Sequence, residues 1–312
     1  MKGPLFYSKI LLFGEYGIIK DSRGLSIPYN FYNGALKIDR LDSQKKKDSN
    51  QKLLNYVEYL STIHHDDSIP VKFDIEALLT DLHQGMYFDS SIPQGYGVGS
   101  SGALVAAIYD KYAFNKITVL ENLNQEKLQT LKYIFGEMES FFHGKSSGLD
   151  PLNSYLSLPI LINSKDSIEP AGIPSQTQTG KGAVFLLDSG TIGETAPMVN
   201  IFMENMKQEG FRKMIKERFV KHTDACVENF LSGDVKKLFS NVKSLSKVVL
   251  ENFKPMIPKH FHDLWKHGLE TNSYYLKLCG SGGGGYMLGF TEDIDKAKSA
   301  LKGHKVEVVY NF

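Results

Sequence analysis

Short runs of apolar residues alternate along the chain with longer stretches in which apolar residues recur at helical spacing. The short runs are rich in β-branched and aromatic residues and predict strands at residues 7–13, 36–38, 86–91, 183–188, 275–278, 286–290 and 305–310. Helical spacing predicts helices at residues 53–63, 73–83, 101–114, 126–143, 196–243, 259–269 and 293–301, the fifth of them broken near Gly210 and Gly233. Because strands and helices are interleaved, the class is mixed α and β, with no internal repeat.

Two polar segments interrupt this pattern. Residues 39–52 contain Lys45, Lys46 and Lys47, and we expect a solvated loop there rather than a binding patch. Residues 164–182 are rich in Ser, Thr, Gln, Gly and Pro, which indicates a connection or a hairpin with loops. A domain boundary is therefore expected near residue 165, in a chain whose 312 residues suit one large or two ordinary domains.

The composition is that of a globular protein and excludes several kinds of partner. The chain is 42% hydrophobic and 23% charged, and its 36 basic and 35 acidic residues give a net charge of +1. A chain-wide basic field for nucleic acid is therefore absent, and no nucleic-acid partner is expected. Cys226 and Cys279 have no metal-ligand spacing, and no apolar run approaches the ~20 residues of a membrane span. We expect reduced thiols, no membrane partner, no secretory signal and a cytoplasmic protein.

The 28 glycines are a slight excess, and a large share of them lies in two clusters, the first at residues 93–103 and the second at residues 280–285. The first cluster spans residues 93–103 and contains, directly before an apolar helix, Gly95, Gly97, Gly99, Ser100 and Ser101. Such a loop can turn backbone N–H groups toward a phosphate, and the start of the helix adds donors and a positive dipole end. The serines can cap the helix or offer a hydroxyl to phosphate-bound Mg²⁺. The spacing is neither the Walker pattern nor the dinucleotide fingerprint. The alternative that this loop only turns the chain and binds no phosphate therefore stays open.

Three motifs in this order resemble those of the GHMP kinases, the superfamily of galactokinase, homoserine kinase, mevalonate kinase and phosphomevalonate kinase. Residues 93–103 resemble the phosphate-binding motif, Pro-x-Gly-x-Gly-x-Gly-Ser-Ser-x-Ala. Residues 9–16, with the sequence KILLFGEY, resemble the first motif, and residues 277–285, with the sequence KLCGSGGGG, resemble the third. Together the motifs span almost the whole chain.

Residues 139–150, with the sequence ESFFHGKSSGLD, are similar to a pattern of the mevalonate kinases. In that pattern a glutamate lies eleven residues before the aspartate of a Ser-Gly-Val-Asp turn. The resemblance implies that Asp150 is the catalytic base, that Lys9 stabilises charge, and that Ser101 and Glu139 hold Mg²⁺. It further implies nucleotide-binding residues, namely Ser90, Gly95, Tyr96, Gly97, Val98, Gly99, Ser100 and Ser101. It implies substrate-binding residues as well, namely Lys9, Glu15, Tyr16, His143, Ser147, Gly148, Asp150, Gly282 and Gly283.

The chain also departs from the mevalonate kinase pattern near the expected acceptor pocket. Tyr16 replaces a common histidine, Lys145-Ser146 replaces an Asn-Pro pair, and Pro151 follows Asp150 where an asparagine is usual. Taken without the resemblance, an aspartate before proline is ordinarily a turn residue. A glutamate at the position of Glu139 is ordinarily on the solvated face of an amphipathic helix.

The resemblance implies an α+β, two-lobed GHMP kinase fold. By this resemblance, residues 1–165 are expected to form an ATP-binding lobe like domain 2 of ribosomal protein S5, and residues 166–312 a ferredoxin-like lobe. The implied function is transfer of the γ-phosphoryl group of ATP, with Mg²⁺, to the hydroxyl of mevalonate for isoprenoid precursor synthesis. The alternatives are another small alcohol (phosphomevalonate, homoserine or a sugar) or a non-catalytic nucleotide-binding protein. A homodimer is one possible oligomeric state, and the sequence does not decide it.

Overall fold

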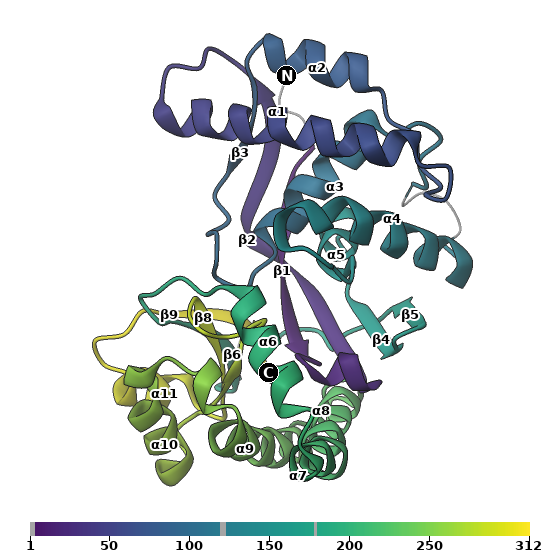
Figure 1. The fold of residues 1–312 in the computed structure, drawn as a ribbon. Helices are drawn as coiled ribbons and strands as arrows, with labels where there is room; N and C mark the ends of the chain where they lie inside the picture. The colour runs from purple at the N-terminus through teal and green to yellow at the C-terminus, as the bar shows by residue number, and fades with distance from the viewer. Residues whose placement is uncertain (1–3, 119–122, 178–179) are drawn as a thin grey trace. The chain divides into compact units, whose positions relative to one another are not determined.

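The computed structural model describes residues 4–118, 123–177 and 180–312. The fold is α+β, and the chain divides into two compact units (Figure 1). Unit 1 consists of Met1–Lys9, Ile27–Pro93 and Gly99–Leu158, and unit 2 consists of Ile10–Ser26, Gln94–Val98 and Pro159–Phe312. Strands β1 (Phe6–Phe13) and β2 (Gly24–Ile38) therefore each contribute residues to both units.

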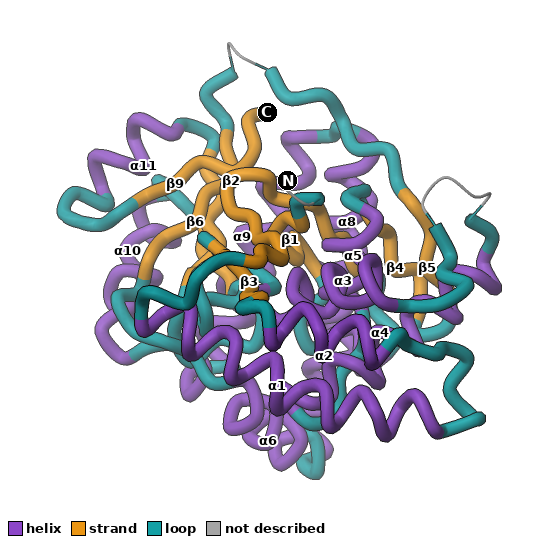
Figure 2. The backbone as a smooth tube through the Cα atoms, turned by 90° about the horizontal axis from the view of Figure 1, so that it is seen from above, coloured by secondary structure: helices purple, strands orange, loops and turns teal. Residues whose placement is uncertain are grey.

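Unit 1 is mainly helical. Besides the parts of β1 and β2, its elements are α1 (Gln44–His65), α2 (Ile75–His83), β3 (Met86–Ser90), α3 (Ser100–Tyr112), α4 (Gln125–His143) and α5 (Leu149–Leu156). Strand β3 pairs antiparallel with the end of β2, with Gly34 opposite Ser90 and Ile38 opposite Met86. Helix α1 packs against α2, β3 and α4, and both Figure 1 and Figure 2 show α2 beside α1. Helices α3, α4 and α5 pack on one another around fully buried aromatic side chains that include Tyr109 and Phe135.

The expectation of a loop over residues 39–52 is wrong from Gln44 onward, where α1 begins. Ser43 is the N-cap residue, and its hydroxyl accepts a hydrogen bond from the backbone N–H of Lys46 at 3.3 Å. This satisfies one of the N–H groups that a helix start leaves without an intrahelical partner. The polar first turns are therefore helical, although their side chains face water.

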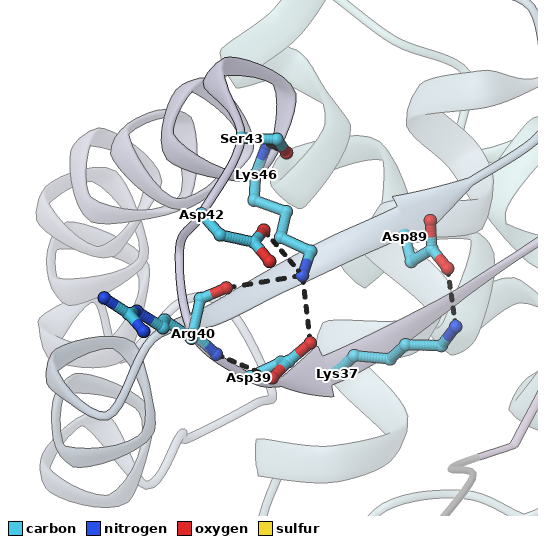
Figure 3. Close-up of polar contacts among 7 residues, drawn as sticks. All are labelled: Lys37, Asp39, Arg40, Asp42, Ser43, Lys46 and Asp89. Carbon is cyan, nitrogen blue, oxygen red and sulfur yellow. Dashed lines mark hydrogen bonds and ion pairs between the residues drawn. The ribbon is translucent and has the colours of Figure 1, made fainter.

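Ion pairs hold the connection between β2 and α1 (Figure 3). The ammonium group of Lys46 lies 2.9 Å from the carboxylate of Asp39 and 3.0 Å from that of Asp42. The hydrogen bond to Asp39 is the largest cause that raises the pKa of Lys46 above its ordinary value. A second pair, Lys37 with Asp89 at 2.5 Å, joins β2 to β3. Because most of these groups are exposed, their role is to fix local geometry rather than to stabilise the fold strongly.

Unit 2 contains a ferredoxin-like arrangement of β-α-β-β-α-β elements. The strands of its sheet are β6 (Ala183–Asp188), β7 (Tyr275–Leu278), β8 (Tyr286–Thr291) and β9 (Val306–Asn311). They lie in the order β7-β8-β6-β9, and every neighbouring pair is antiparallel. The helices between β6 and β7 are α6 (Thr195–Asn205), α7 (Glu209–Met214), α8 (Lys221–Ser232), α9 (Val235–Asn252) and α10 (His262–Thr271). Helix α11 (Ile294–Ala300) connects β8 to β9.

Smaller elements complete unit 2. A hairpin of β4 (Ile160–Ser164) and β5 (Ser167–Pro170) pairs through β4 with the start of β2. Single helical turns lie at Gly17–Lys20, Lys254–Met256 and Lys259–Phe261, and a π-helical segment, Ile215–Val220, joins α7 to α8. In the core, Trp265 is fully buried, and its indole N–H donates to the hydroxyl of Ser246 at 2.8 Å. None of the helices in the described parts of the chain combines the length and the apolar character that a membrane span requires.

Candidate active site

The start of α3 presents backbone donors in unit 1. Gly99 is the N-cap residue, with φ of 80°, and it has no side chain to satisfy the first N–H groups of the helix. Ser100 and Ser101 follow as the first two helical residues. A helix N-terminus of this kind favours an anion, because the first N–H groups of a helix have no partner within it and the positive end of its dipole lies there. A β-carbon on Gly99 would lie 3.0 Å from Cγ of Lys9, so this helix start lies against the lysine of the first motif.

A buried carboxylate lies beside the same helix start. The hydroxyl of Ser101 donates to Oε1 of Glu139 at 2.8 Å, and the hydroxyl of Ser146 donates to Oε2 at 2.6 Å. Glu139 is only 4% exposed, although a glutamate on an amphipathic helix is ordinarily solvated. Burial, followed by the nearby charge of Asp150, raises the pKa of Glu139 from 4.5 to about 7. A cation at this carboxylate would oppose both effects.

Helix α4, which carries Glu139, is held in place by two tyrosines of α1. The hydroxyl of Tyr56 donates to the backbone carbonyl of Met138 at 3.0 Å, and that of Tyr59 donates to the carbonyl of Glu137 at 2.9 Å. Tyr56 is fully buried. The two residues before Glu139 are therefore anchored from a separate helix, which limits the movement of its backbone.

Lys9 and Asp150 form an ion pair in unit 1. Nζ of Lys9 lies 2.8 Å from Oδ1 of Asp150. The lysine side chain is 5% exposed, whereas the aspartate side chain is 37% exposed, so the carboxylate can be reached from outside. A buried ammonium needs such a partner, and a half-exposed carboxylate held by it can accept a proton from a bound hydroxyl group.

Asp150 is positioned by close packing of α5 on α3. Gly148 is the N-cap residue of α5, and Pro151 lies in the first turn, where its missing N–H is tolerated. A β-carbon on Gly102 of α3 would lie 2.7 Å from the carbonyl carbon of Asp150 and 2.8 Å from the nitrogen of Pro151. Only glycine permits this approach, so Gly102 sets how near the backbone of Asp150 lies to α3. Asp150 is thus a helical residue, although an aspartate before proline is ordinarily found in a turn.

Ser101 and Glu139 offer the oxygen donors that Mg²⁺ prefers. Among the described residues, no group of three or more His, Cys, Asp and Glu side chains could hold a metal ion. The protein would therefore supply one hydroxyl and one carboxylate, and phosphate oxygens and water would complete the shell. This donor set fits Mg²⁺ bound with a nucleotide and does not fit a structural zinc site.

The remainder of the first glycine cluster, Gln94–Val98, packs on the second cluster inside unit 2. The N–H of Gly193 donates to the carbonyl of Gly95 at 2.9 Å, and the N–H of Tyr286 donates to the carbonyl of Tyr96 at 3.3 Å. A β-carbon on Gly97 would collide with the carbonyl oxygen of Cys279, so glycine is required there. A β-carbon on Gly285 would lie 2.5 Å from Cα of Tyr96, so the two clusters, distant in sequence, are in close backbone contact.

Glu15 and Tyr16, expected near the substrate, are both buried in unit 2. The carboxylate of Glu15 pairs with the ammonium group of Lys277, which is 3% exposed. The hydroxyl of Tyr16 donates to the backbone carbonyl of Ser281 at 2.7 Å, and its ring stacks on Phe202 at 4.7 Å between centroids. Burial raises the pKa of Tyr16 well above its ordinary value, so the hydroxyl remains a donor. The first motif therefore holds the start of the second glycine cluster.

The other predicted site residues differ in burial and in their contacts. The hydroxyl of Ser90 accepts from the N–H of Ile92 at 3.0 Å, and Ser147 is exposed. Gly282 is buried, and the N–H of Gly283 donates to the carbonyl of Met256 at 2.6 Å. The side chain of His143 lies outside the part of the chain that the structure describes.

Lys277 and Ser146 also belong to this arrangement, although the sequence motifs assign neither of them a role. Lys277 stands in the third motif, and Ser146 appears only as a departure from an Asn-Pro pair. A lysine in an otherwise apolar strand is a signal of a buried ion pair, since a buried lysine needs a partner. For Ser146 no comparable signal exists, because a serine before Ser-Gly is typical of an exposed turn.

A family match supports the N-terminal part of this arrangement. Residues 62–157 match the family described as GHMP kinases N terminal domain. The match includes the first glycine cluster, Ser101, Glu139 and Asp150. Among curated proteins, none matches the sequence.

Solved structures with the same fold cover nearly the whole chain. Mevalonate kinase of L. major, in complex with R-mevalonate, has a TM-score of 0.65 and 16% identity, covering 100% of this chain and 99% of that one. Mevalonate kinase of Methanococcus jannaschii has a TM-score of 0.58 and 17% identity, covering 99% and 98%. Phosphomevalonate kinase of Streptococcus pneumoniae, in complex with phosphomevalonate and AMPPNP, has a TM-score of 0.61 and 12% identity, covering 98% and 99%. These structures confirm the two-lobed α+β fold. The resemblance to the GHMP kinases is supported for residues 62–157 by the family match.

Proposed function

We propose that this chain, whose residues 62–157 match the GHMP kinases N terminal domain, is a GHMP kinase that transfers the γ-phosphoryl group of ATP to the hydroxyl of mevalonate. GHMP kinases are ATP-dependent phosphotransferases, and the match over residues 62–157 supports the same activity for this chain. The observation that carries it is the pairing of Lys9 with Asp150 at 2.8 Å in the same unit as the Ser101–Glu139 pair. An acceptor-activating carboxylate, a fixed positive charge and oxygen donors for a cation are the groups that phosphoryl transfer requires.

Each of these groups has a defined task in the reaction. Asp150 accepts the proton of the acceptor hydroxyl as the oxygen forms its bond to the γ-phosphorus, and ADP departs with the electrons of the broken bond. Lys9 stabilises the negative charge that develops on the attacking oxygen and on the transferred phosphoryl group. Ser101 and Glu139 would hold Mg²⁺, which when bound neutralises phosphate charge. The N–H groups at the start of α3 would bind phosphate oxygens, so no basic surface is needed.

The choice of mevalonate rests on sequence details beyond the fold. Glu139 lies eleven residues before Asp150, as in the mevalonate kinase pattern. The L. major structure with the same fold holds R-mevalonate. The Streptococcus pneumoniae structure holds phosphomevalonate, which makes that acceptor the second candidate. A non-catalytic protein is disfavoured, because Lys9, Asp150, Ser101 and Glu139 are all present and paired.

A coupled assay of ADP release distinguishes these acceptors. With ATP and Mg²⁺, we expect turnover with mevalonate at a kcat/KM at least ~10-fold above that for phosphomevalonate, homoserine or galactose, because a site built for one polar pattern rejects others. Reactions without enzyme and reactions without acceptor serve as blanks. A higher kcat/KM for one of the other three would replace mevalonate as the substrate. No ADP release with any of the four would favour the non-catalytic alternative.

A further inference from the structure

The turn between α4 and α5 contains a serine whose hydroxyl contacts two functional segments at once. Oγ of Ser146 lies 2.6 Å from Oε2 of Glu139 and accepts a hydrogen bond from the N–H of Gly148 at 3.1 Å. We propose that Ser146 is a positioning residue that orients the Glu139 carboxylate toward a nucleotide-bound Mg²⁺. This inference rests on the proposed kinase function.

The hydrogen bonds of Ser146 have one consistent direction. A hydroxyl has one proton to donate and lone pairs to accept with. Since the oxygen of Ser146 accepts from the N–H of Gly148, its single proton is available for the carboxylate of Glu139. A donor to a carboxylate at 2.6 Å is a short, charge-assisted contact, about twice as strong as a neutral one. The Glu139 side chain is therefore held in one orientation.

Ser146 and Ser101 bond to different oxygens of the same carboxylate. Ser101 donates to Oε1 of Glu139, and Ser146 donates to Oε2. The contact with Ser146 thus leaves the oxygen that faces Ser101 for the cation that these two residues would share. Partners of this kind, which do not touch the metal themselves, set the direction of a ligand and commonly change metal affinity when removed.

The same turn is tied to both of the helices that it joins. The N–H of Ser146 donates to the hydroxyl of Ser140 in α4 at 3.3 Å. On the other side, its hydroxyl holds the N–H of Gly148, the N-cap residue of α5, two residues before Asp150. Ser146 is itself only half-buried, so little apolar packing depends on it. Its removal should therefore change the orientation of Glu139 more than the stability of the unit.

Titration calorimetry of the whole chain tests this role without relying on turnover. We expect Ser146→Ala to weaken the binding of Mg·ATP by about tenfold, the lower end of the effect of such partners. The affinity for ATP in EDTA should stay at the wild-type value, because Glu139 does not then hold a cation. Ser146→Thr keeps the hydroxyl and should restore most of the Mg·ATP affinity. Ser61→Ala is the matched control, since it removes a hydroxyl that donates within α1, to the carbonyl of Val57.

The outcomes separate this inference from the proposed function. Unchanged Mg·ATP affinity in Ser146→Ala, or a loss in Ser146→Thr as large as in Ser146→Ala, would overturn the role of Ser146 and leave the kinase proposal standing. Equal loss of affinity with and without Mg²⁺ would also overturn it, because that is the signature of a general structural defect. If the wild-type chain bound ATP no better with Mg²⁺ than in EDTA, the proposed function would fail together with this inference.

Discussion

Asp150→Asn is expected to abolish phosphoryl transfer while ATP continues to bind. Asparagine can still accept the hydrogen bond from Lys9, whose ammonium lies 2.8 Å from the aspartate, but it cannot take the proton of the acceptor hydroxyl. Loss of a general base typically lowers the rate by ~10²–10⁴-fold, and we expect kcat to fall by at least that much. Steady-state ADP release measures kcat, and calorimetry with Mg·ATP measures binding.

The matched control for this substitution is Asp110→Asn. Asp110 is also a partly exposed aspartate of unit 1 and pairs with Lys116 at 3.0 Å. It should keep wild-type turnover, which would show that the loss of an aspartate–lysine pair alone does not reduce the rate. Near-normal kcat in Asp150→Asn would mean that Asp150 is not the base.

Glu139→Gln is expected to inactivate the enzyme and to stabilise the metal-free chain at alkaline pH. The loss of activity should reach at least ~100-fold in kcat/KM, since a ligand should matter more than the partners that orient it. The gain in stability follows from the pKa of Glu139, which burial and then Asp150 raise from 4.5 to about 7. Between these values the folded chain binds more protons than the unfolded chain, so the stability of the wild type falls as pH rises through this window.

The wild type and Glu139→Gln should therefore differ in stability at pH 8 and have similar stability at pH 5. At pH 8 the folded wild type carries a buried charge that glutamine removes. Because each unit of pKa shift corresponds to ~1.4 kcal/mol, this removal should raise the free energy of unfolding by on the order of a few kcal/mol. At pH 5 Glu139 is mostly protonated in the folded chain, and glutamine resembles that neutral form. Thermal unfolding in EDTA at both pH values gives the comparison, with Glu137→Gln on the same helix as the control. A Tm difference that is the same at pH 5 and pH 8 would show that Glu139 does not carry the raised pKa.

Elements buried on both faces can be read directly from the sequence. Strand β6 is predicted at residues 183–188 and is found at Ala183–Asp188, because a continuous apolar run leaves little choice of structure. Gly233, where a break in the helical stretch is predicted, ends α8 in a left-handed conformation. In both places the local sequence and the tertiary environment favour the same conformation.

Elements with polar ends are harder to predict, because distant contacts decide where they begin. The first turns of α1 have no apolar face, and they are helical because Ser43 caps them and Lys46 pairs with Asp39 and Asp42. Helix α5 begins at Leu149, in a Gly-x-x-Pro sequence that is typical of a turn. Its packing against Gly102 of α3, which the sequence does not reveal, provides the helical environment.

The candidate site shows the same division. The spacing of Glu139 and Asp150 is visible in the sequence, and through the resemblance it indicates which carboxylates act together. The sequence does not show that Glu139 is buried, or that two serines, one of them in a turn, bond to its two oxygens. These contacts depend on how α3, α4 and the turn before α5 pack together. Several residues that are far apart in sequence determine this packing.

Phosphorus NMR of the wild-type chain with ATP, Mg²⁺ and mevalonate tests the central proposal most directly, because it identifies where the γ-phosphoryl group goes. We predict that the γ-phosphorus signal of ATP is replaced by ADP and by a new phosphate monoester in equal amounts. Inorganic phosphate in place of the monoester would mean that water, rather than the mevalonate hydroxyl, receives the phosphoryl group. Either that result or unchanged ATP would contradict a kinase that acts on mevalonate through Lys9 and Asp150.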